Sequence, residues 1–223
     1  VAAFLVVTAL VTTAASADNE VVYRETFPVA KDQATKLTEL GWQAWVYSIA
    51  NQKLHRDAAG YSELAHGKPS RPADVEPFNA QTPDDAPTDT GLLINWNGGT
   101  FWPNPTLYFT QELILDEVSR LASVSWFQNN QGSTGGFRLA LRINRDWLVS
   151  GENHIGFKTV KQSMADTKWY PFDPSELSFD AEAEPVDLPE GTLTAIGVFG
   201  KHTGYAELDT FTVHVKDSVD EPR

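Results

Sequence analysis

Cysteine is absent from this chain of 223 residues, and basic residues are scarce. Without cysteine the protein has no disulfide, no thiolate nucleophile and no cysteine-ligated metal, so its stability must come from a packed core. Seventeen lysines and arginines stand against thirty aspartates and glutamates, which gives a net charge of −13. A negative field of this size repels nucleic acid, anionic lipid headgroups and acidic polysaccharides. The composition therefore favours a neutral or cationic partner.

Familiar catalytic and cofactor motifs are missing as well. The sequence has no Gly-x-Ser-x-Gly elbow, P-loop, dinucleotide fingerprint, His-Glu-x-x-His or EF-hand loop. Its histidines show no ligand-like spacing; they are His55, His66, His154, His202 and His214. No apolar run is long enough to span a bilayer. Binding is therefore a better expectation than catalysis, although catalysis stays open.

The first 17 residues have the pattern of a secretory signal peptide. An apolar run over residues 1–10 is followed by Ala15, Ser16 and Ala17, which match an A-x-A cleavage site. We expect cleavage after Ala17 and a secreted, extracellular protein. The run lacks an initiator Met and a positive n-region, so we expect that the signal peptide is truncated at its start. Export without cysteine is typical of a bacterial route.

Short alternating segments rich in β-branched and aromatic residues dominate from Asp18 onward. The predicted strands are Val21–Phe27, Trp42–Ile49, Gly91–Trp96, Thr106–Leu113, Ala122–Gln128, Gly136–Asn144, Trp147–Ser150, His154–Thr159, Leu177–Ala181, Leu193–Phe199 and Ala206–Val215. Helix is limited to short turns around Gln33–Leu40 and Leu115–Leu121. Many strands and few helices predict an all-β fold, a two-sheet antiparallel β-sandwich of the jelly-roll type.

One domain is expected over residues 18–216, with a charged tail over residues 217–223. Residues 50–90 break the strand rhythm, because they carry five prolines, many charges and few large apolar groups. We interpret them as one long inserted loop, either a solvated insertion or a lid. We expect the domain to be a monomer.

The alternation is clearest over residues 136–144. Phe137, Leu139, Leu141 and Ile143 share one face, and Arg138, Ala140, Arg142 and Asn144 share the other. This pattern predicts a sheet with one buried side and one wet side.

Aromatic and planar polar side chains next to this wet face suggest a sugar-binding surface. The candidate ligand-binding residues are Trp126, Gln128, Arg138, Arg142, Trp147 and Trp102. If the strands at 122–128 and 136–144 pair as a hairpin, most of these side chains share one surface. Sugars offer C–H faces to aromatic rings and hydroxyl pairs to amide or guanidinium groups, so this composition suits a glycan. We expect Trp42, Trp45 and Trp96 in the core.

Two enzymatic readings remain open on the same face. A sandwich glycosidase needs two facing carboxylates, for which Glu112 with Asp116 or Glu117 are the candidates by position. A lyase needs a Tyr or His base beside an Arg or Gln, and Tyr108 is of a suitable type. Neither pattern is specific.

Three segments near the two ends of the chain share a recognisable pattern: Tyr23-Arg24-Glu25-Thr26-Phe27, Gly41-Trp42 and Glu207-Leu208-Asp209-Thr210-Phe211-Thr212-Val213. They resemble the first and last strands of bacterial jelly-roll carbohydrate-binding modules and concanavalin A-like domains. The resemblance implies that the first and last strands pair. It also implies that Glu25 and Asp209 hold a structural calcium, and oxygen ligands suit that ion.

The first hypothesis is therefore a secreted, non-catalytic β-sandwich that binds a neutral polysaccharide or oligosaccharide through an aromatic and polar sheet face. The second is a glycan-active enzyme, a glycoside hydrolase or polysaccharide lyase, with its cleft over that face. The third is a structural or adhesive surface protein whose exposed aromatics contact other proteins. Nucleic acid is not an expected partner.

Overall fold

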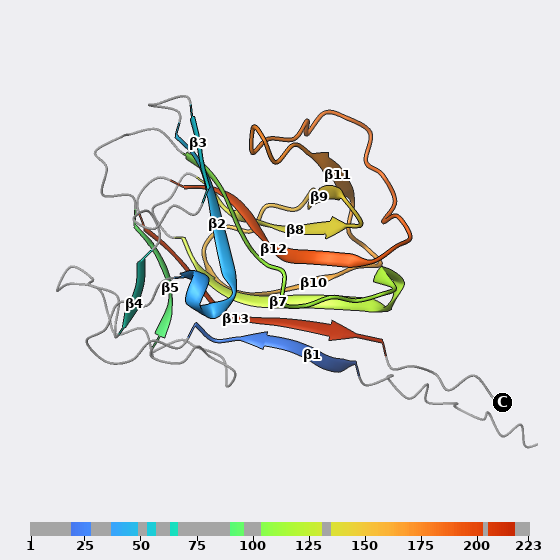
Figure 1. Cartoon of the computed structure of the whole chain (residues 1–223), viewed down its shortest axis with the longest axis horizontal. Helices are drawn as coiled ribbons and strands as arrows, with labels where there is room; N and C mark the ends of the chain where they lie inside the picture. The colour runs from blue at the N-terminus through green and yellow to red at the C-terminus, as the bar shows by residue number, and fades with distance from the viewer. Residues whose placement is uncertain are drawn as a thin grey trace, which may run out of the picture.

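The computed structural model describes residues 19–27, 37–48, 53–56, 63–66, 90–95, 104–130, 135–202 and 205–216. The predicted signal peptide, most of the 50–90 insertion and the charged tail lie outside these residues. Within them, the chain forms two antiparallel sheets, so the predicted two-sheet sandwich is confirmed (Figure 1).

Six strands make the first sheet, in the order β10-β7-β13-β5-β4 with β1 paired to β13. Their bounds are β1 Glu20–Glu25, β4 Glu63–His66, β5 Thr90–Asn95, β7 Leu121–Asn129, β10 Phe157–Ser163 and β13 Tyr205–Val215. Strand β13 is long enough to pair β5 through its first half and β1 through its second half. The predicted pairing of the first and last strands is confirmed.

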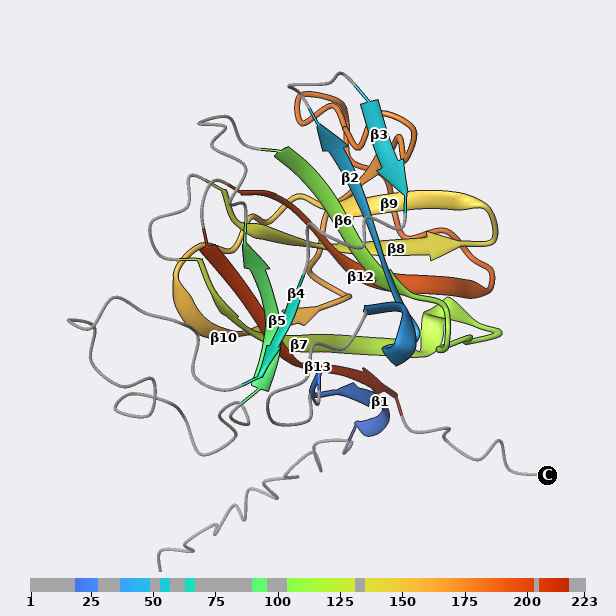
Figure 2. The same ribbon diagram turned by 60° about the vertical axis from the view of Figure 1, so that its left-hand side comes forward.

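Seven strands make the second sheet, in the order β11-β9-β8-β12-β6-β2-β3. Their bounds are β2 Trp42–Ser48, β3 Lys53–Arg56, β6 Asn104–Thr110, β8 Phe137–Ile143, β9 Asp146–Ser150, β11 Trp169–Phe172 and β12 Leu193–His202. The chain passes repeatedly from one sheet to the other, which is the jelly-roll arrangement. Figure 2 shows β2, β6, β8, β9 and β12 side by side.

Several local expectations differ from the structure. The predicted strand Leu177–Ala181 is a turn with one isolated bridge, because Asp173 and Ser178 exchange backbone hydrogen bonds around it. The strands β3, β4 and β11 were not predicted. The expected helical segments are short 3-10 turns, η1 at Leu37–Leu40 and η3 at Val118–Arg120.

The main core lies between the sheets and is built from alternate residues of each strand. Strand β8 contributes Phe137, Leu139, Leu141 and Ile143, as the alternation predicts. Phe211 packs there between two tryptophans: its ring centroid is 5.3 Å from that of Trp42 and 6.4 Å from that of Trp126. We call the face of the seven-stranded sheet that meets this core its inner face, and the opposite one its outer face.

Candidate functional site

The predicted sugar-binding residues are divided between the two sheets. Strand β7, with Trp126 and Gln128, pairs with β10 and β13 in the six-stranded sheet. Strand β8, with Arg138 and Arg142, pairs with β9 and β12 in the seven-stranded sheet. The predicted hairpin between them is therefore wrong: the segment after Asn129 crosses between sheets. Alternation within each strand was visible in the sequence, but nothing local specified the partner strand.

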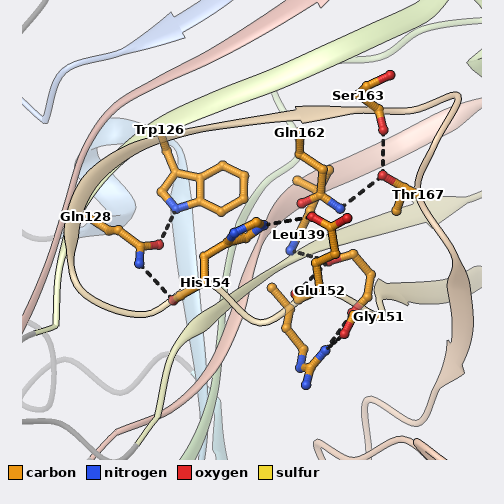
Figure 3. A network of polar contacts seen from close by, with 11 residues as sticks. Trp126, Gln128, Leu139, Gly151, Glu152, His154, Gln162, Ser163 and Thr167 are labelled. Carbon is orange, nitrogen blue, oxygen red and sulfur yellow. Dashed lines mark hydrogen bonds and ion pairs between the residues drawn. The ribbon is translucent and has the colours of Figure 1, made fainter.

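Trp126 and Gln128 face the core and offer nothing to a ligand. Both are fully buried, and Trp126 Nε1 donates a hydrogen bond to Gln128 Oε1 at 2.9 Å. Gln128 Nε2 in turn donates to the backbone oxygen of His154 at 2.7 Å (Figure 3). A buried amide must satisfy its polar atoms with hydrogen bonds. The Gln128 amide does so by bridging the Trp126 ring and the backbone of the segment between β9 and β10, which passes from one sheet to the other. Trp126 and Gln128 therefore stabilise the core and do not form a surface on which a sugar could stack.

His154 lies next to this pair, in the segment that leads from β9 in one sheet to β10 in the other. Its ring lies edge-on to Trp126, with centroids 5.5 Å apart, and its Nε2 is 3.4 Å from Glu152 Oε2. Burial lowers the pKa of His154 below its usual value, although the charge of Glu152 acts in the opposite direction. The neutral imidazole is therefore favoured where the two sheets are tied together.

The outer face of the seven-stranded sheet carries a second layer of aromatic side chains. Phe109 on β6 and Trp147 on β9 have two strands between them, yet their ring centroids are 5.1 Å from each other. The two strands between them present Ala195, Gly197 and Ala140, whose small size leaves room for the rings. A Cβ on Gly197 would come within 1.9 Å of the Tyr108 backbone oxygen, so no larger residue fits there.

Trp147 belongs to this layer but is 6% exposed, so the prediction of an accessible ring is wrong. Trp45 on β2, which was expected in the core, lies on the outer face beside it, with centroids 6.1 Å apart. Trp45 and its strand neighbour Tyr47 are both partly exposed. Among the tryptophans that the structure describes, Trp45 is therefore the accessible one. Its spacing in Trp42-x-x-Trp45 puts the two rings on opposite faces of β2, a signal that strand alternation could have revealed.

Strand β11 and the segment after it cover part of the outer face. Phe172 of β11 lies 4.9 Å from Phe199, and Phe179 lies 6.2 Å from Phe199 and 5.9 Å from Tyr170, all between ring centroids. Leu177 is fully buried in the same layer. Phe179 and Tyr170 keep part of their surface exposed. The cover is therefore partial at Tyr170 and Phe179.

Arg138 stands beside this partial cover, at the rim of a hollow of about 260 Å³. The lining residues are Gly135, Gly136, Arg138, Asn153, Phe179, Ala181, Phe199, Gly200 and Lys201. Arg138 Nη1 donates to the backbone oxygens of Ser150 and Gly151, and its guanidinium lies 5.0 Å from the centre of the Phe179 ring. The predicted open surface beside Arg138 thus exists, but with Phe179 rather than Trp126 as the ring next to it.

Arg142 lies on the same outer face, between Ala195 and Trp147 in the register of neighbouring strands. It is partly exposed, and its Nε is buried with no hydrogen-bond partner among the described residues. The predictions for Trp102 and Trp96 fall outside the described residues.

The two predicted calcium ligands are set in different surroundings. Glu25 Oε1 accepts a hydrogen bond from the Phe27 amide at 2.7 Å. Burial raises the pKa of Glu25, and the charge of Glu112 adds to the effect. Asp209 is 2% exposed and accepts hydrogen bonds from Thr210, at a β-bulge in β13. Within the described part of the chain, no three histidine or acidic side chains gather closely enough to hold a metal.

The enzymatic candidates do not converge on the hollow. Tyr108 is fully buried in the inner core, and burial raises its pKa, so it is not available as a lyase base. Glu112, Asp116 and Glu117 are exposed near the start of η3, and none of them lines the hollow.

Comparisons with known proteins find similar solved structures but no related sequence. No family model matches the chain, and no curated protein matches it. Similar solved structures include a family 11 carbohydrate-binding module from Clostridium thermocellum in complex with a β-1,3-1,4-mixed-linked tetrasaccharide. It shares 13% identity and a TM-score of 0.41, over 78% of this chain and 88% of that one.

A second similar structure is the family 11 module of the cellulosomal cellulase Lic26A-Cel5E from the same organism. It shares 11% identity and a TM-score of 0.44, over 89% of this chain and 95% of that one. Likeness at this level carries no argument about this chain and transfers no residue. Separately, no helix among the described residues has the length and apolar character needed to cross a membrane.

Proposed function

We propose that this chain is a secreted, non-catalytic carbohydrate-binding module that holds a neutral glycan against the outer face of its seven-stranded sheet. One observation carries the proposal: this face combines the partly exposed rings of Trp45, Tyr47 and Phe179 with the Arg138 guanidinium and a hollow of about 260 Å³. The polar and aromatic groups belong to rigid strands or pack directly on them. A binding site built this way is largely formed before the ligand arrives.

The chemistry of the face suits sugars. Aromatic rings pack against the C–H faces of pyranose rings, and planar charged groups hydrogen-bond pairs of hydroxyls. Trp45 is supported from beneath by Phe109, at 4.9 Å between ring centroids, and by Trp147. A ring fixed from below loses little conformational freedom on binding, which favours affinity.

The proposed lack of catalysis rests on the residues around the hollow. Its lining contains Arg138, Lys201 and Asn153 but no aspartate, glutamate or histidine among the described residues. A glycosidase needs a carboxylate on each side of the scissile bond. The composition of this lining therefore supports binding.

The test is retention on neutral polysaccharides, followed by titration with the best ligand. Trp45→Ala should weaken binding at least about tenfold, because it removes the supported ring. Phe157→Ala is the matched control, since Phe157 is a partly exposed ring of β10 that packs on Phe127 in the other sheet. Unchanged retention by Trp45→Ala would refute this face as the site. Release of new reducing ends or unsaturated products would instead favour an enzyme.

Secretion and calcium binding are parts of the same proposal with tests of their own. Expression of the full-length precursor with an intact leader should yield a secreted protein that begins at Asp18. If Glu25 and Asp209 hold calcium, chelation should lower the melting temperature, because a ligand bound only by the native state stabilises it. Glu25→Gln should abolish that shift. The same melting temperature with calcium and with chelator would remove calcium from the proposal.

A further inference from the structure

We infer that the hollow beside Arg138 is a subsite for the carboxylate of an acidic sugar, carried as a side group on the neutral glycan. This inference rests on the proposed function, because that function supplies the glycan. It adds a substrate class: a neutral main chain with uronic acid substituents.

The first argument is that Arg138 is a partly buried cation with no acidic partner among the described residues. Its Nη1 donates to two backbone oxygens, and burial lowers the pKa of its guanidinium. Within the described ranges, no carboxylate forms an ion pair with Arg138. Burial of an unpaired charge is costly, and an anion bound by the remaining N–H donors offsets that cost. The backbone contacts hold the guanidinium in place, so the donors are oriented in advance.

The second argument is the sign of the charge around the hollow. Arg138 and Lys201 line it and no acidic residue does so among those described, although the whole chain has 30 acidic and 17 basic residues. Lys201 and Asn153 are exposed, and neither side chain has a hydrogen-bond or ion-pair partner in the described part of the molecule. The hollow is thus a locally basic spot with free donors on an acidic protein. Such a spot attracts a carboxylate that the rest of the surface repels.

The third argument is shape. Phe199 and Phe179 provide an apolar wall, as the C–H face of a sugar requires. A volume of about 260 Å³ lies just below the usual range of roughly 300–1,000 Å³ for small-molecule pockets. One sugar ring therefore suits the space better than a run of several rings.

The fourth argument is position. Trp45, Leu107, Phe199 and Arg138 form one cross-strand row over β2, β6, β12 and β8. Three strand spacings separate Trp45 from Arg138, which is about 14 Å. A main chain that stacks on Trp45 and a side group that enters the hollow can therefore belong to the same glycan molecule.

The experiment compares unsubstituted xylan with glucuronate-substituted xylan, and free glucuronate with glucose and acetate. The wild type should bind the substituted xylan about tenfold more tightly than the plain one, as expected for a charged hydrogen bond. Glucuronate binding should weaken as salt is raised, because the attraction is electrostatic. Lys201→Ala and Arg138→Gln should each lose most of the preference. Lys161→Ala, an exposed lysine of β10 in the other sheet, should keep it.

Equal affinity for the two xylans would overturn the inference, as would a preference that survives both Lys201→Ala and Arg138→Gln. Acetate bound as tightly as glucuronate would also overturn it, because then the sugar ring makes no contribution. Lys201 is exposed, so Lys201→Ala stays informative even if Arg138→Gln disturbs the fold. Failure of the proposed function has a different signature: neither xylan is retained and Trp45→Ala changes nothing, whereas free glucuronate still depends on Lys201.

Discussion

The two faces of the seven-stranded sheet are both apolar, but they are covered to different extents. On the inner face, Leu139, Ile196 and Val198 are fully buried against the six-stranded sheet. On the outer face, Phe109 and Phe199 are buried almost as deeply, by neighbouring rings, by β11 and by the segment after it. That cover is incomplete, and the partly exposed side chains gather at its margin. Depth of burial alone therefore does not separate the core from the proposed binding face; the extent of the cover does.

Charged groups distinguish the two faces more clearly than aromatic ones. Strand β8 directs Leu139 and Leu141 inward, while Arg138, Ala140 and Arg142 face outward. A guanidinium at the margin keeps contact with water, and on the inner face it would be buried without a partner. The arginines therefore mark the side of the sheet where cover is partial.

The largest effect that tests this comparison is expected from Trp126→Ala. Loss of the fully buried ring should reduce the free energy of unfolding by about 3–5 kcal/mol, because it leaves a cavity and unpairs Gln128. Trp45→Ala on the partly covered face should cost about half as much. Urea denaturation of both variants measures the difference. Equal losses would mean that the outer layer is as closed as the core.

A smaller loss in the free energy of unfolding is expected from Gly197→Ala, which tests whether the aromatic rings of the outer face need a small residue beneath them. The added Cβ would meet the Tyr108 backbone oxygen and the Phe109 Cα, 1.9 and 2.5 Å away, and backbone yields little. The variant should lose about 1–3 kcal/mol and shift the Trp147 fluorescence. Gly151→Ala is the control, because its Cβ would meet the Tyr170 ring at 2.8 Å and a side chain can move. A larger loss in the control would contradict this account.

Lowering the pH should reduce the stability of the fold through His154, which lies where the chain passes from one sheet to the other. Burial lowers the pKa of His154 in the folded state, so below the usual pKa of 6.5 the unfolded chain binds more protons. Stability is then complete above pH 6.5 and falls as the pH drops through and below that value. Glu152 opposes this effect, while Lys158 and Arg138 add to it.

Thermal melting between pH 8 and 5 measures this dependence, and His154→Gln should flatten it. Burial and Lys161 also lower the pKa of His214, so part of the slope should remain in that variant. A slope that is unchanged in His154→Gln would place the titrating group elsewhere.

The smallest effect is expected from Glu25→Gln. Burial raises the pKa of Glu25, and Glu112 adds to this, so the ionised carboxylate is disfavoured in the folded state above its usual pKa of 4.5. In calcium-free buffer at pH 7, the variant should match the wild type or melt slightly higher, because the amide oxygen still accepts the Phe27 amide. A clear loss of stability would show that the charge itself is needed.

The alternation of side chains along the sequence predicted much of the fold but little of the candidate site. The 2.0-residue period over residues 137–143 predicted β8 and its buried side, whereas the β1–β13 pair was implied by the family resemblance of the two chain ends. The prediction of the site was wrong because it depended on strand pairing. Trp126 and Arg138 are 12 residues apart in the sequence but lie in different sheets. Trp45 was missed because an aromatic residue in a strand was equated with core, although its spacing from Trp42 put it on the other face.

By itself, the sequence determined that this is a cysteine-free, acidic chain of alternating strands that must bury its apolar faces in two layers. Side-chain period is a local property, so it can be read without knowing the partner strands. Only the tertiary structure decided which strands became neighbours, and hence which ring stayed accessible and which arginine came to line a hollow. Those outcomes depend on contacts between segments far apart in the chain, and alternation within one strand shows only which residues share a face, not what covers that face.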